Sequence, residues 1–125
     1  MRGLAAMGVV WSISLLLVWS AGVWTTATAA AIVLCVASAV FAIGECLHGA
    51  IHAPLGVDLA PPRLLGRYLA LSSLSWQVGW ILGPAAGGFM LGHAPLALWP
   101  AAAAVNLVCA GAALGLERRI PERLL

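Results

Sequence analysis

Three titratable side chains lie close together in a long apolar stretch of the 125-residue sequence: Glu45, His48 and His52. Successive residues of a helix are about 100° apart, so both histidines come within roughly 60° of Glu45 and all three share one face. A carboxylate beside two imidazoles is what a proton relay needs. The alternative is structural: Glu45 braces a neighbouring helix through a buried hydrogen bond, and the histidines fill an interface between helices.

The same residues also have the spacings of metal ligands. Glu45-x-x-His48 resembles one half of a diiron site, and His48 and His52 have the i,i+4 spacing of a metal-binding helix face. A diiron site needs a second such pair and further carboxylates, which the sequence lacks. We therefore predict no metal site. We also expect no other cofactor, no catalytic residues and no enzymatic activity.

The elements that position these side chains must be helices that cross a membrane. Hydrophobic residues make up 63% of the sequence and charged residues 8%, and residues 3–44 and 68–116 contain no Asp, Glu, Lys or Arg. Each of these segments has about the length of two spans of roughly 20 residues. We expect an all-α polytopic membrane protein, a single membrane region over residues 1–125, with four transmembrane helices at about 4–20, 28–57, 68–91 and 96–116.

The charged residues predict the orientation of these helices. All six basic residues are arginines, and they lie near the N-terminus, in a loop over residues 58–67 and in a tail over residues 117–125. By the positive-inside rule both termini and the loop, with Asp58, Arg63 and Arg67, are cytoplasmic. The arginines do not alternate with aromatic residues, so we expect the lipid bilayer and no nucleic acid as a partner. A cleaved signal peptide up to about Ala30 is disfavoured, because the apolar stretch continues through Ala42.

Small residues recur every fourth position in the third predicted helix. Ser75, Gly79, Gly83 and Gly87 form a ladder that lets another helix backbone approach closely. Pro84 lies within the ladder and removes a hydrogen-bond donor, so we expect a bend there. Gln77, on the same helix, either lines a polar path or bonds to a neighbouring helix.

The stretch from Gly79 to Gly88 reads GWILGPAAGG and fits GxxxGPxxGG throughout. It resembles the antiporter motif of the major facilitator superfamily, which occurs in transmembrane helix 5 and, in a related form, in helix 11. The residues before it resemble the passage from helix 10 to helix 11 in drug-efflux members; they are Gly44-Glu45, Pro54, residues 57–61 (VDLAP) and Gly66-Arg67-Tyr68.

The resemblance implies a fold and a function. The predicted helices correspond to helices 9–12 of twelve, in a drug:proton antiporter of a bacterial inner membrane that exports a small amphipathic molecule. It implies that Glu45 is proton-linked, that Gln77 lines the transport pathway, and that Gly79, Gly83, Pro84, Gly87 and Gly88 form a packing and bending element. His48 and His52 are not part of the pattern, so a place for them in the pathway depends on geometry alone.

Four helices cannot enclose a cavity that lies between two six-helix halves. We therefore expect a C-terminal fragment, inactive alone, whose partners are the missing helices 1–8 of the same transporter. Two alternatives remain. One is a self-assembling four-helix transporter of the small multidrug type. Such transporters carry their intramembrane Glu in the first helix, whereas Glu45 lies in the second predicted helix of this chain. The other is a small membrane subunit that does not transport.

Overall fold

The computed structural model describes residues 2–24 and 26–117 and has four long helices. They are α1 (Arg2–Ser20), α2 (Ala27–Leu59), α3 (Leu65–His93) and α4 (Pro95–Glu117), with two short 3₁₀ turns, η1 (Ala21–Val23) and η2 (Pro62–Leu64). The prediction of an all-α protein is confirmed. The last eight residues of the predicted tail lie outside the described part of the chain.

The helix ends follow from local chemistry. The side chain of Thr26 accepts a hydrogen bond from the amide of Ala29 (3.3 Å) and so caps α2. Pro61 and Pro62 separate α2 from α3. Pro95 occupies the first position of α4, where a proline costs no helical hydrogen bond.

The helices are longer than the sequence predicted, and their connections are correspondingly shorter. Asp58 lies within α2, and Arg67 lies within α3 rather than in a loop. His93 is the last residue of α3, so only Ala94 separates α3 from α4. Prolines do not stop these helices, because α2 continues through Pro54 and α3 through Pro84.

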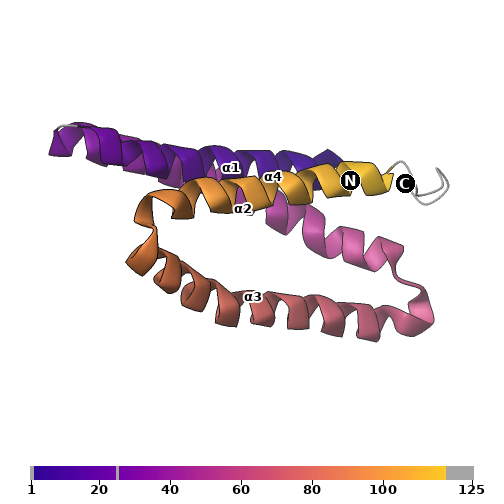
Figure 1. Cartoon of the computed structure of the whole chain (residues 1–125). Coiled ribbons are helices and arrows are strands. Elements are labelled where there is room, and N and C mark those ends of the chain that lie inside the picture. Colours follow the sequence, from indigo (N-terminus) through magenta and orange to yellow (C-terminus); the bar gives the residue numbers. More distant parts are fainter. Residues whose placement is uncertain (1, 25, 118–125) are drawn as a thin grey trace.

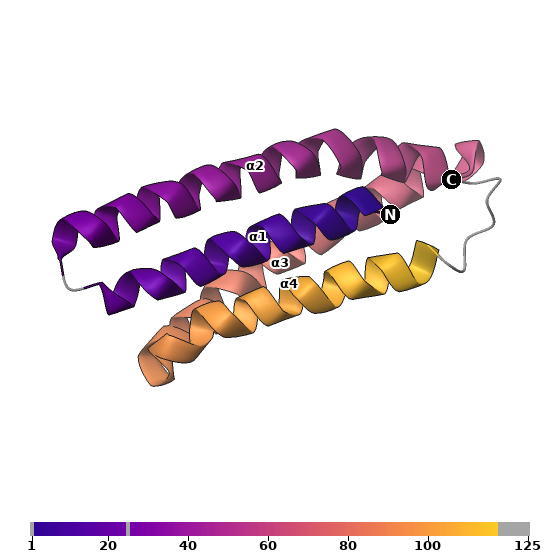
Figure 2. The same cartoon turned by 90° about the horizontal axis from the view of Figure 1, so that it is seen from above.

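Helix α1 is the centre of the bundle. It packs on α2 on one side and on α4 on the other, as Figure 2 shows, whereas α3 lies below these three and touches them sparsely (Figure 1). The beginning of α1 and the connection between α2 and α3 lie at one end of the molecule, and the other two connections lie at the opposite end. Arg2 and η2, with Arg63, are therefore at the same end.

Three of the helices are long and apolar enough to cross a membrane, counted over the described residues: Arg2–Val23, Ala27–Asp58 and Pro95–Leu116. The sequence predicted four. Helix α3 is long enough, but its Ser, Gln, Trp, Gly and Pro residues make it less apolar than the other three.

The bundle buries very little of its apolar surface. The buried residues of the described chain are all small: Ala5, Ala37, Ala60, Ala103 and Ala110, Ser12 and Ser14, and Gly8 and Gly44. The accessible surface is 8777 Å², against about 6,300 Å² expected for a compact globular protein of this mass. Large apolar side chains such as Trp80 and Ile81, each 71% exposed, lie on the outside. An apolar medium or further helices must therefore cover them.

Candidate functional site

Helix α2 carries a stack of aromatic and imidazole rings that joins three helices. His48 and His52 are one turn apart, and their rings stack with centroids 4.8 Å apart. The His48 ring also lies 5.6 Å from Trp11 of α1 and 5.3 Å from Trp76 of α3. Trp11 in turn stacks on Phe41, with centroids 6.1 Å apart. His48 is thus the point at which α1, α2 and α3 meet through their side chains.

Glu45 does not join this stack. It is exposed, and no residue in the described part of the chain forms a hydrogen bond or an ion pair with it. The bracing hydrogen bond that was one alternative for Glu45 is therefore not made within residues 2–24 and 26–117. The structure thus brings His48 and His52 into contact and gives Glu45 no hydrogen bond or ion pair within the described residues. No group of three or more His, Cys, Asp or Glu residues with a metal-binding arrangement occurs among the residues described.

Close helix packing occurs on α1, where the sequence analysis did not place it. A side chain at Gly8 would meet Ala110 and the Asn106 carbonyl of α4, each at 3.1 Å. One turn later, the buried Ser12 hydroxyl lies 2.7 Å from the Gly8 carbonyl and 3.1 Å from the Ala103 carbonyl, to which it donates across the helix pair. Small residues let the two backbones approach, as in other membrane helix pairs.

The second face of α1 packs on α2 in the same way. The buried Ser14 hydroxyl donates to the Ala37 carbonyl of α2 at 2.9 Å. A side chain at Gly44 would overlap the indole of Trp11, whose ring lies against the α2 backbone at this point. The indole Nε1 is buried and has no hydrogen-bond partner among the described residues. Trp11 and Gly8 carried no signal in the sequence, since a single Trp or Gly in an apolar helix does not reveal its neighbour.

The glycine ladder of α3 contacts no other helix of the described chain. No atom lies within 4 Å of the position that a side chain would take at Gly79, Gly83, Gly87 or Gly88. The hydroxyl of Ser75 donates to the Leu71 carbonyl of its own helix at 2.9 Å. The ladder is therefore an uncovered face of α3, and the expected close packing needs a partner other than α1, α2 and α4.

The remaining predicted site residues are on the surface. Gln77 is exposed and makes no hydrogen bond within the described chain. Asp58, Arg63 and Arg67 are also exposed, and no ion pair joins Asp58 to either arginine in the part of the protein that the structure describes. The structure gives these four residues no common site.

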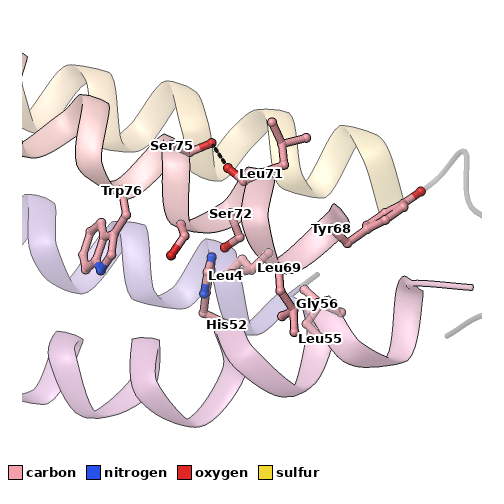
Figure 3. A pocket seen from close by; sticks show the side chains of 11 residues that line it. Leu4, His52, Leu55, Gly56, Tyr68, Leu69, Leu71, Ser72, Ser75 and Trp76 are labelled. Carbon is pink, nitrogen blue, oxygen red and sulfur yellow. Dashed lines mark hydrogen bonds between the residues drawn. The ribbon is translucent and has the colours of Figure 1, made fainter. Parts of the chain in front are cut away.

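A cavity of about 680 Å³ lies between α1, α2 and α3, next to the ring stack, and is partly open to the outside. Figure 3 shows it between Trp76 and Tyr68 of α3, with His52 of α2 pointing toward α3. Leucines from all three helices, among them Leu4, complete an apolar lining. No sequence pattern predicts this cavity, because its presence depends on how far α3 lies from α2.

The comparison with known proteins gives one partial relative. The chain is 42% identical over 59 residues to YhjO, an uncharacterized MFS-type transporter of Bacillus subtilis. The matched segment is 46% of this chain but 14% of YhjO, so the chain spans a small part of its relative's length. No family model matches the chain. No solved structure matches it either. The similarity supports a relationship to MFS transporters and, with the apolar helices, a membrane location.

Proposed function

We propose that this chain is the part of a major facilitator superfamily transporter that forms helices 9–12, in a bacterial inner membrane. The observation that carries the proposal is the 59-residue similarity to an MFS-type transporter. The GxxxGPxxGG stretch from Gly79 to Gly88 supports it, as do the apolar helices. All four helices cross the membrane in this proposal, with both termini in the cytoplasm. A transport role also agrees with the expectation that the protein is not an enzyme.

The uncovered surface supports a larger assembly. The chain exposes apolar side chains along its helices, and the glycine face of α3 is open over its whole length. In the proposal, helices 1–8 of the transporter cover part of this surface. The assembly exports a small amphipathic molecule in exchange for protons, and the chain alone transports nothing.

A chimera tests the proposal. The chain replaces helices 9–12 of YhjO, the four helices to which the proposal assigns it, and the product is examined for membrane insertion and for elution as a single species in detergent. Gly83→Leu should disrupt the chimera, because a branched side chain separates backbones that meet at the ladder. The same substitution in the chain alone should not lower its thermal stability, because Gly83 there faces open space and leucine has a higher helix propensity than glycine.

Gly92→Leu is the matched control. Gly92 lies on α3 outside the motif and also has no neighbour within 4 Å, so this variant should be tolerated in the chimera and in the chain alone. If Gly83→Leu and Gly92→Leu had the same effect on membrane insertion and elution of the chimera, the proposed packing at the ladder would be overturned. Proton-dependent dye efflux by the chain alone, in a host that lacks efflux pumps, would instead favour a self-assembling four-helix transporter.

A further inference from the structure

The cavity between α1, α2 and α3 has the composition of a binding site for a small organic molecule. Its volume of about 680 Å³ lies within the roughly 300–1,000 Å³ of known ligand pockets. Such pockets are mostly apolar and contain a few convergent polar groups. Here leucines supply the apolar lining, and His52, Ser72 and Ser73 supply the polar groups.

These three polar groups have no hydrogen-bond partner in the part of the chain that the structure describes. Serines in membrane helices bond to the carbonyl four residues earlier, as Ser75 and Ser38 do at 2.9 Å. Ser72 and Ser73 make no such bond, and the His52 ring nitrogens have no hydrogen-bond partner within the described residues. Two hydroxyls and one imidazole are therefore available to a molecule that enters the cavity.

The rings at the ends of the cavity and the lack of charged residues in its described lining restrict the class of molecule that it can bind. Trp76 lies at one end and Tyr68 at the other (Figure 3), and aromatic rings of this kind stack on aromatic ligands. No carboxylate and no arginine is among its described lining residues. Glu45 is seven residues before His52, about 10 Å along the helix, and does not line the cavity. The lining therefore offers no counter-charge for a cation or an anion.

We infer that this cavity binds an uncharged aromatic molecule, stacked on Trp76 and hydrogen-bonded to His52, Ser72 and Ser73. This inference rests on the proposed function. In the proposed transporter, the bound molecule is either a substrate or a modulator that occupies this cavity. The inference separates ligand recognition from Glu45. It thus differs from a site in which a membrane carboxylate attracts a cationic drug.

Binding is measured on the 125-residue chain in phosphatidylcholine nanodiscs. The assay includes no transport step, so a failure of the chain to bind the probe is distinct from a failure of the proposed transport function. The probe is naphthol, and the comparison compound is the naphthylmethyl-trimethylammonium cation. Equilibrium dialysis against empty nanodiscs corrects for partition into lipid. We expect saturable binding of one naphthol per chain and no saturable binding of the cation.

Trp76→Phe should weaken naphthol binding severalfold and Trp76→Ala about tenfold, because stacking area is lost. Ser72→Ala combined with Ser73→Ala should weaken it by a similar factor. Trp80→Ala is the matched control and should leave binding unchanged, since Trp80 lies on the same helix, is exposed and does not line the cavity. Circular dichroism of each variant checks that the helices remain. Saturable binding of the cation, equal losses in the Trp76 and Trp80 variants, or no saturable naphthol binding would each overturn the inference.

Discussion

The indole of Trp11 lies against the backbone of Gly44, so closely that a side chain at position 44 would overlap the ring. This contact sets the distance between α1 and α2 at their midpoint. It also fixes the indole beside Phe41 and His48, with which it forms the ring stack. Gly44 thus positions the histidines indirectly, because it leaves room for the Trp11 indole, which contacts His48.

Gly44→Ala should destabilise the chain. The added methyl group forces the indole or the helix to move, which costs about 1–3 kcal/mol in the free energy of unfolding. Gly49→Ala is the control on the same helix, because position 49 faces open space and alanine there gains up to about 1 kcal/mol in helix propensity. Thermal unfolding in dodecylmaltoside, followed by circular dichroism, measures both. Equal unfolding midpoints would contradict the close contact.

Ser12→Ala should weaken the pairing of α1 with α4. The Ser12 hydroxyl is 2% exposed and donates to Ala103 of the other helix; hydrogen bonds of this kind in membrane proteins contribute about 0.6 kcal/mol on average. Ser38→Ala removes a hydroxyl that bonds only within α2 and is exposed. We expect a loss of about 0.5–1.5 kcal/mol for Ser12 and a smaller change for Ser38. A larger effect at Ser38 in the same unfolding assay would rule out this account of the helix pair.

The proposed four-span topology can be tested with a reporter that is active only in the periplasm. Fusions at Gly22 and His93 should be active, because these residues lie at the end of the molecule opposite Arg2 and η2. Fusions at Pro62 and Leu125 should be inactive. Reporter activity at Leu125 would show an odd number of spans, as expected if α3 does not cross the membrane.

Glu45→Gln should leave the unfolding midpoint of the chain unchanged, since no described residue bonds to this carboxylate. In a transport-competent assembly the same variant should lose proton coupling, because glutamine keeps the size and hydrogen bonding of glutamate but cannot release a proton. Substrate-driven proton release from vesicles measures the second effect. Unchanged coupling would remove Glu45 from the proton pathway.

The sequence predicted the elements better than their contacts. Charge-free segments indicated helices, and the described chain has four long ones. The spacing of Gly79, Gly83 and Gly87 indicated a packing face, but spacing does not say which helix covers it, and the described chain leaves it uncovered.

The candidate site was predicted only in part. Helical periodicity placed His48 and His52 together, and their rings stack. It did not predict that Glu45 is exposed, because the exposure of a side chain depends on neighbouring helices. Trp11 and Trp76 come from two other helices, so their contacts with His48 are tertiary and leave no mark in local spacing.

The hydrogen bond from Ser12 to Ala103 joins residues 91 positions apart, and this separation has a consequence for biosynthesis. At about 5–20 residues per second, a ribosome needs on the order of ten seconds to extend the chain from one to the other. During that interval Gly8 and Ser12 have no α4 to contact. Until then, α1 lies beside α2 in the insertion machinery or in lipid. The contacts between α1 and α4 form only after α4 has been synthesised.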